Sequence, residues 1–216
     1  MTTGTIQKSS QKKWFTEQES YSLGDSGFVQ LRLNAVNYQS DPQTHAFNTP
    51  YQLSLVPPKQ LARERLFGGR MLRDLPKDAH VTSHDVRHGD ILVFASDGVW
   101  DNLSSQDLLQ RVSHIMKVFD AWPTSVMGGV RVGEKLESLT KDLGSSSMDN
   151  YSLQKVLATI LVSEAKQASR NTRVDGPFAR EVNRNFPHER FRGGKVDDIC
   201  LIVAIVVQHP PPEETT

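Results

Sequence analysis

The stretch "ILVFASDGVWDN", residues 91–102, gives the clearest indication of the fold of this chain. Residues 91–95 are all apolar, which predicts a short buried strand. The strand leads directly to Asp97 and Gly98, and a second carboxylate follows at Asp101. A carboxylate at such a position is held by rigid backbone and still reaches solvent at the edge of the sheet. We therefore interpret the stretch as a core strand that carries acidic side chains to a sheet edge.

The composition of the chain argues against several classes of function. The chain has 216 residues, enough for one generous domain or two small ones, and 37% of them are hydrophobic. Its 25 basic residues balance 25 acidic residues, which argues against binding to nucleic acid or to an anionic membrane as the main function. A single cysteine, Cys200, excludes an internal disulfide framework and a cysteine-based zinc cluster, and it fits a reducing compartment.

The longest apolar run is "ICLIVAIVV", residues 199–207, which has about half the length of a membrane span. We therefore expect no transmembrane segment. The run is apolar on both alternating faces, so we expect a second sheet to cover one face and helices to cover the other. Cys200 lies inside this run and is predicted to be buried in the core. The polar start, residues 1–20, and the proline-rich tail, residues 209–216, are predicted to be disordered.

The first half of the chain has the pattern of strands. Two short strands are predicted around the turn at 24–27, a strand broken by proline in 44–58, and a strand–turn–strand unit over 79–98. The charged segment 59–80 between them is predicted to be a loop. The links among these strands are short enough for hairpins.

The second half has mainly the pattern of helices. Ser104 or Ser105 is predicted to cap an amphipathic helix, and a longer helix is predicted over 151–169. Shorter helices are predicted at 133–142 and 176–186. Because strands stand at both ends and helices between them, the chain is predicted to be α+β with mainly antiparallel pairing.

Three turns of the chain contain aspartate: "GDSG" with Asp25, "SDGVWD" with Asp97 and Asp101, and "KVDDI" with Asp197 and Asp198. Acids gathered from several turns need a compensating cation, and hard oxygen ligands suit Mg²⁺ or Mn²⁺. Asp-Gly is also a common turn pair and aspartate also caps helices, so any one of these motifs alone is more often structural. Spacing alone leaves both interpretations open.

Other catalytic motifs are missing from the chain. The seven histidines show no HExxH spacing, and the serine at 26 lies in no GxSxG elbow. The glycine pairs at 68–69, 128–129 and 193–194 lack the residues of nucleotide-binding loops. A nucleophilic serine and a nucleotide-binding loop are therefore not predicted.

The acidic motifs resemble those of a known family. "GDSG" at 24–27, "FASDGVWDN" at 94–102 and "GGKVDDICLIV" at 193–203 are similar, in this order, to the later motifs of the metal-dependent (type 2C) serine/threonine protein phosphatases. "QTHAFNTPYQLS" at 43–54 and "GPFARE" at 176–181 resemble the mitochondrial-type branch. The resemblance implies a four-layer αββα sandwich of two mainly antiparallel sheets flanked by helices. It also implies phosphoprotein substrates, a monomer, and a mitochondrial rather than a cytoplasmic location.

The resemblance further implies two Mg²⁺ or Mn²⁺ ions that activate a water for in-line attack on phosphorus. Asp97 and Asp197 would ligate one of the two core ions. Asp25 and Asp101, with Asp97, match positions that hold a weaker third ion in some members. The resemblance gives supporting roles, outside direct metal coordination, to Gly98, Asp198 and Ser26.

The family's earlier motifs, which include an aspartate that bridges both metals and an arginine that holds the phosphate, have no counterpart before 24–27. We therefore expect a truncated form, with residues 21–208 as the C-terminal part of a phosphatase domain and only part of the metal site. An inactive module that binds phosphoproteins is the alternative. "SDGVWDN" also resembles the acidic motif of haloacid dehalogenase-type phosphatases, but the DxD nucleophile of those enzymes occurs nowhere in the chain.

Overall fold

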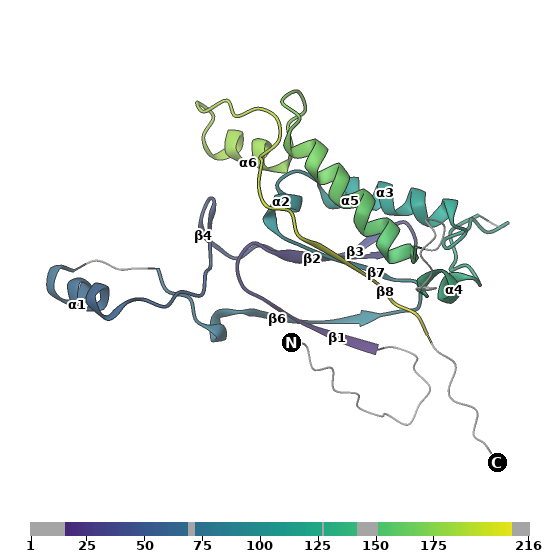
Figure 1. Cartoon of the computed structure of the whole chain (residues 1–216), viewed down its shortest axis with the longest axis horizontal. Coiled ribbons are helices and arrows are strands. Elements are labelled where there is room, and N and C mark those ends of the chain that lie inside the picture. The colour runs from purple at the N-terminus through teal and green to yellow at the C-terminus, as the bar shows by residue number, and fades with distance from the viewer. Residues whose placement is uncertain (1–15, 69–71, 127, 142–150, 209–216) are drawn as a thin grey trace, which may run out of the picture.

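The computed structural model of the chain describes residues 16–68, 72–126, 128–141 and 151–208. The segments 1–15 and 209–216, predicted to be disordered, lie outside these ranges. Helices pack on one face of a four-stranded sheet, and a two-stranded ribbon lies on its other face (Figure 1). This arrangement of helices and antiparallel sheets confirms the predicted α+β class.

The main sheet has the strand order β3–β2–β7–β8, and all its pairs are antiparallel. Its strands are β2 (Gly27–Arg32), β3 (Ala35–Gln39), β7 (Ile91–Ala95) and β8 (Leu201–Ile205). The predicted core strand, β7, lies between β2 and β8, and four of its five residues are buried. The most apolar stretch of the first half of the chain thus forms the centre of the sheet.

The register of this sheet positions the acidic turns. Ala95, the last residue of β7, lies opposite Gly27, the first residue of β2, and also opposite Leu201, the first residue of β8. The ends of three strands therefore meet at one edge of the sheet. The chain places an aspartate two to four residues beyond each of these ends, at Asp97, Asp25 and Asp197.

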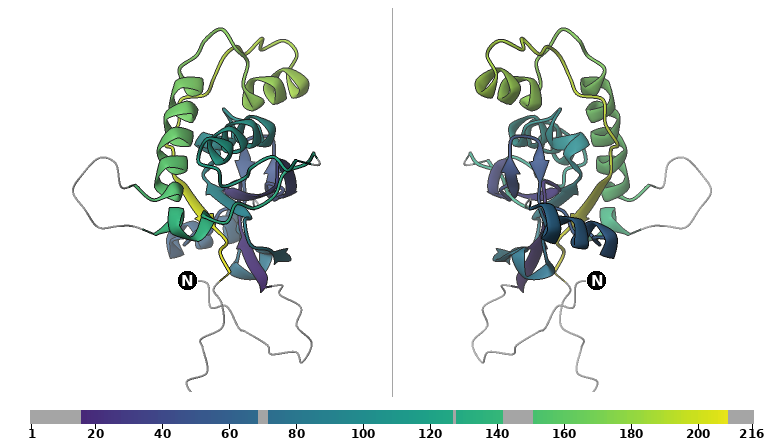
Figure 2. Two further views of the ribbon diagram at one scale, coloured as in Figure 1. Left: turned by 90° about the vertical axis from the view of Figure 1, so that its right-hand side faces the viewer. Right: turned by 90° about the vertical axis from the view of Figure 1, so that its left-hand side faces the viewer.

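The predicted helices form the layer on one face of the sheet (Figure 2). They are α3 (Ser105–Val118), α4 (Leu136–Thr140), α5 (Leu153–Ser169) and α6 (Pro177–Asn185). Ser104 is the N-cap of α3: its Oγ accepts a hydrogen bond from the Asp107 N–H (3.2 Å), and Asp107 Oδ2 accepts one from the Ser104 N–H (2.8 Å). Within the described ranges, no helix is long and apolar enough to cross a bilayer.

The ribbon on the opposite face pairs β1 (Thr16–Ser22) with β6 (His80–Val86). Two predictions are corrected here. Part of β1 falls within residues 1–20, which were predicted to be disordered, and β1 does not form a hairpin with β2. The turn at 24–27 instead carries the chain from the ribbon to the main sheet, so the shortness of a link did not establish which strands pair.

The segment 59–80, predicted to be a loop, contains the helix α1 (Pro58–Phe67) and the 3₁₀ turn η1 (Pro76–Asp78). α1 begins at a proline, which favours the first turn of a helix, and it is rich in good helix formers. None of its residues is buried. Because α1 presents no apolar face to a core, hydrophobic periodicity could not reveal it.

Cys200 was predicted to be buried, but it is exposed. It lies just before β8, the edge strand of the main sheet, and lines a cavity of about 590 Å³ between that sheet and the β1–β6 ribbon. Ile202, on the same face of β8, is also exposed. The ribbon therefore covers this face incompletely, whereas α5 packs against β8 from the other side.

Trp122 is the largest fully buried side chain of the described ranges, and its Nε1–H donates a hydrogen bond to the Gly89 carbonyl (3.0 Å). We expect Trp122→Phe to lower the free energy of unfolding by about 2 kcal/mol, because the Gly89 carbonyl loses a buried partner. The measurement is urea denaturation followed by circular dichroism. Tyr21→Phe, which removes an exposed hydrogen bond to Glu19, is the control and should change stability by less than about 0.5 kcal/mol. Equal effects of the two variants would contradict the prediction.

Candidate metal centre

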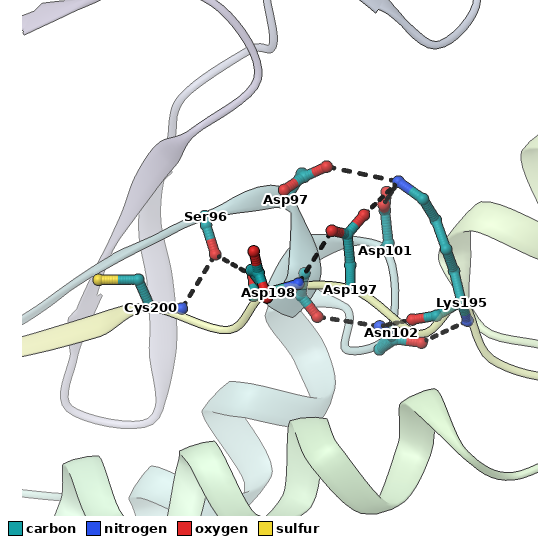
Figure 3. A network of polar contacts seen from close by, with 9 residues as sticks. Ser96, Asp97, Asp101, Asn102, Lys195, Asp197, Asp198 and Cys200 are labelled. Atoms are coloured by element: carbon teal, nitrogen blue, oxygen red, sulfur yellow. Dashed lines mark hydrogen bonds and ion pairs between the residues drawn. The ribbon is translucent and has the colours of Figure 1, made fainter.

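The acid-bearing turns after β7 and before β8 are tied together by Ser96. Its Oγ donates a hydrogen bond to the Asp198 carbonyl (2.9 Å) and accepts one from the Cys200 N–H (3.0 Å). Figure 3 shows these two contacts of the Ser96 side chain. The Ser96 N–H also donates to the Cys200 carbonyl (3.0 Å), so the ladder between the strands extends beyond the last residue of β7 and the first residue of β8. These hydrogen bonds therefore fix the position of the turn that carries Asp97 relative to the turn that carries Asp197.

Gly98 allows these two turns to approach each other closely. It lies in α2 (Asp97–Trp100), a single helical turn that follows β7. A Cβ atom at this position would lie 2.3 Å from the carbonyl oxygen of Asp198 and 2.9 Å from its carbonyl carbon. No side chain can occupy that space, so glycine is required here by the neighbouring backbone rather than by its own dihedral angles.

Asn102, two residues after the end of α2, links the same region to the loop before β8. Its Nδ2 donates hydrogen bonds to the carbonyls of Gly98 (2.9 Å) and Lys195 (2.8 Å). Its Oδ1 accepts one from the Lys195 N–H (2.9 Å). Asn102 is buried, and its amide thus satisfies both backbone polar groups of Lys195.

Three carboxylates converge on one point at this sheet edge. One oxygen from each of Asp97, Asp101 and Asp197 lies within 4.8 Å of the others. The Lys195 ammonium reaches over the same point, with Nζ 2.6 Å from Asp101 Oδ2, 2.9 Å from Asp197 Oδ2 and 3.4 Å from Asp97 Oδ2 (Figure 3). A positive charge therefore already lies among the three acids.

The pKa values in the cluster reflect this contact. Burial acts to lower the pKa of Lys195, but hydrogen bonds to Asp101 and Asp197 outweigh it and raise that pKa above its usual value. The hydrogen bond from Lys195, joined by one from the Asp198 N–H, lowers the pKa of Asp197. Burial raises the pKa of Asp101 in spite of its hydrogen bond from Lys195. The lysine is therefore charged throughout the neutral range and favours the ionised form of its partners.

Asp25 lies beside the cluster, outside the three side chains whose oxygens converge. Burial, together with the negative charge of Asp97, raises the pKa of Asp25. Asp25 lines a cavity of about 600 Å³ together with Asp97 and Asp101. The cavity lies directly next to the cluster, so a molecule bound in it would be in reach of these acids.

The other walls of this cavity come from the β4–β5 hairpin and from α6. The hairpin, formed by β4 (Thr44–Ala46) and β5 (Thr49–Pro50), contributes Phe47 from its turn, and α6 contributes Phe178. The two rings lie 5.7 Å apart, and Lys195 Nζ lies 4.8 Å from the centre of the Phe178 ring. The lining of the cavity thus combines acidic and aromatic side chains.

The donor set fits a divalent cation of the hard type. Carboxylate oxygens are the ligands that Mg²⁺ and Mn²⁺ prefer, and three of them already surround a cationic group. The Lys195 ammonium contacts the same oxygens that such an ion would contact. The residues present are therefore compatible with the metal chemistry that the acidic turns suggested.

The structure brings most of the predicted site residues together. Oxygens of Asp97, Asp101 and Asp197 lie close together, and Asp25 lines the same cavity as Asp97 and Asp101. Ser26 lines the cavity, and Asp198 contributes its backbone to the contacts with Ser96 and Asp197.

Sequence reasoning missed three residues at the site: Ser96, Asn102 and Lys195. For Lys195 a signal was present, because it lies two residues before Asp197 in a glycine-rich loop. Ser96 and Asn102 both flank the acidic turn after β7, and both act through backbone contacts that no short motif encodes.

Comparisons with known proteins agree with the acidic motifs. No protein-family model matches the chain. It is 34% identical over 187 residues to "Protein phosphatase PTC7 homolog fig" of Drosophila grimshawi, covering 87% of this chain and 48% of that protein. It is 31% identical over 188 residues to the Homo sapiens "Protein phosphatase PTC7 homolog", covering 87% and 49%. "Protein phosphatase 2C homolog 7, mitochondrial" of Saccharomyces cerevisiae is 27% identical over 188 residues, covering 87% and 46%.

Among solved structures, the photosystem II phosphatase PBCP has the same fold. It superposes with a TM-score of 0.56 at 24% identity, over 88% of this chain and 59% of that one. The chain spans about half the length of the curated relatives it matches. The motifs and the relatives therefore agree: over 87% of its length the chain is similar to protein phosphatases named PTC7 or 2C homologues.

Proposed function

We propose that the protein hydrolyses phosphoserine and phosphothreonine in phosphoproteins, with Mg²⁺ or Mn²⁺ held at the Asp97–Asp101–Asp197 cluster. The observation that carries the proposal is the convergence of these three carboxylates, from two turns at one sheet edge, around a shared cationic group. The relatives named above as protein phosphatases support the reaction class.

The residues of the chain have distinct roles in this proposal. Asp97 and Asp197 would ligate a core ion. Asp101, the third member of the cluster, would also contribute, with Asp25 and Asp97, to a weaker outer site. When bound, divalent ions of this kind supply an activated water and offset the negative charge that develops on the phosphoryl group. Ser96 and Asn102 keep the ligand-bearing turns fixed through their backbone hydrogen bonds.

The cavity beside the cluster is the proposed binding place for the substrate. Its volume of about 600 Å³ is within the range of small-ligand sites, and the acids lie at one side of it. The aromatic groups of Phe47 and Phe178 provide an apolar wall for the part of the peptide next to the phosphoryl group.

The test is release of phosphate from a phosphothreonine peptide in Mn²⁺ and in EDTA, made with the 216-residue chain and with the longest natural gene product that contains it. We expect Mn²⁺-dependent release by the natural product. Binding of the peptide by both proteins without release would support the alternative of an inactive phosphoprotein-binding module. Neither binding nor release by either protein would contradict the proposal.

We also propose that the protein acts as a monomer in mitochondria, a location that the name of the Saccharomyces cerevisiae relative supports. Cell fractionation with an antibody to the endogenous protein tests the location, and the absence of the protein from purified mitochondria would contradict it. Light scattering after gel filtration tests the oligomeric state.

A further inference from the structure

The contacts of Lys195 are those of a bound cation. Its ammonium has three N–H donors, and three carboxylates, from Asp97, Asp101 and Asp197, surround it at Nζ–O distances of 2.6 to 3.4 Å. The lysine side chain is only 20% exposed, and two of the three carboxylates are about one-third exposed. The pairing is therefore partly shielded from solvent and differs from an ordinary surface ion pair.

The backbone of Lys195 is fixed independently of its side chain. Asn102 binds both the N–H and the carbonyl of Lys195. The preceding residues are also anchored, because the Gly194 N–H donates to the Asn171 carbonyl (2.9 Å) and the Gly193 N–H donates to Asp175 Oδ1 (2.8 Å). The four-carbon stem can therefore swing while the loop and the acidic turns stay in place.

The ammonium also contacts an aromatic ring in this position. The Phe178 ring lies 4.8 Å from Nζ, in the range of a cation–π contact, and it forms part of the cavity wall. An ammonium displaced from the three carboxylates can therefore keep a favourable contact with this ring.

We propose that Lys195 is an internal counter-ion of the metal centre. In the metal-free protein its ammonium holds Asp97, Asp101 and Asp197 together, and a divalent cation binds by displacing it. The ammonium and the cation compete for the same oxygens, so the lysine stabilises the metal-free fold and weakens the affinity for the metal. Its removal should have opposite effects on these two properties.

The experiment compares the wild-type chain with Lys195→Met by two measurements: Mn²⁺ binding by isothermal titration calorimetry, and the thermal midpoint in EDTA. We expect Lys195→Met to bind Mn²⁺ at least about tenfold more tightly, since displacement of an ammonium in contact with three acids is no longer required. We also expect its midpoint in EDTA to fall and to be restored by Mn²⁺, because the acids repel one another without a cation.

The matched control is Arg192→Met. Arg192 lies in the same loop and carries the same charge, but its ion pair is with Asp175 and its side chain is 72% exposed. Removal of this charge should leave the Mn²⁺ affinity within about twofold of the wild type, because exposed charges are well screened. Lys195→Gln, which keeps a polar side chain and is expected to fold more readily, serves in place of Lys195→Met if that variant is unfolded in EDTA.

Because this role presupposes the divalent-cation site of the proposed function, Asp97→Asn is included to separate the two. If the wild type binds Mn²⁺ through Asp97 but both Lys195 variants bind it equally or more weakly, the counter-ion role is wrong and the metal site stands. If neither the wild type nor the Lys195 variants bind Mn²⁺, the metal site itself is wrong and the counter-ion role falls with it. If Arg192→Met bound Mn²⁺ more tightly by the same factor as the Lys195 variants, the gain in affinity would come from the loss of any nearby positive charge. That result would also overturn the counter-ion role of Lys195.

Discussion

Asp97→Asn lowers the affinity of the protein for Mn²⁺ by about 100-fold or more. The amide has the shape of the carboxylate but no charge, and the loss of a residue that only orients a ligand already costs about 10–100-fold. The ion pair between Asp97 and Lys195 is lost as well. The Lys195 ammonium then remains paired with Asp101 and Asp197. The measurement is calorimetric titration with Mn²⁺, with circular dichroism to show that the fold is retained.

Asp41→Asn is the matched control for this variant. Asp41 is exposed in the segment between β3 and β4, and it lies outside the acidic cluster. The same isosteric change there should leave the Mn²⁺ affinity unchanged. An Asp97→Asn protein that binds Mn²⁺ as tightly as the wild type would exclude Asp97 as a ligand.

Gly98→Ala should destabilise the fold and impair the site together. The added Cβ would lie 2.3 Å from the Asp198 carbonyl oxygen, and this neighbour is backbone next to Asp197, which cannot rotate away as a side chain would. Overpacking of this kind costs about 3 kcal/mol of unfolding free energy. Because relief of the clash moves the turn before β8, we also expect weaker Mn²⁺ binding.

Gly68→Ala makes the same chemical change without the clash. No atom lies within 4 Å of its Cβ position, although its φ of 71° strains an alanine. We expect a loss of about 1–2 kcal/mol from backbone strain at the exposed end of α1 and no change in Mn²⁺ affinity. The two variants are compared by chemical denaturation and by Mn²⁺ titration. If Gly98→Ala were no more destabilising than Gly68→Ala, the close approach of the two turns would not be required.

The sequence predicted the site residues that stand at strand ends. The apolar run at 91–95 marked β7, and the position of Asp97 just beyond it followed from the chain alone. Asp197, before the second apolar run, followed in the same way. That both acids meet at one edge depends on the antiparallel register of β7 and β8, which brings Ala95 opposite Leu201. Strand pairing between residues a hundred positions apart has no local signal.

Other features depended on tertiary contacts that the chain does not encode locally. Lys195 gains its position from Asn102, whose amide binds its backbone from a distant turn. Cys200 lies in an apolar run, yet the ribbon leaves its face of β8 partly open. The helix α1 carries good helix formers but buries none of them, so periodicity gave no indication of it. Apolar sequence shows which segments favour burial, but tertiary packing determines how far each of them is buried.

The most direct test of whether Asp97 and Asp197 bind a divalent cation is a crystal structure of the protein soaked in Mn²⁺. Anomalous scattering is recorded to locate the ion. We predict an anomalous peak in contact with oxygens of Asp97 and Asp197, with the Lys195 ammonium moved away from the three carboxylates. The absence of a peak at these acids in a soaked crystal that retains the fold, with Lys195 still among them, would contradict it.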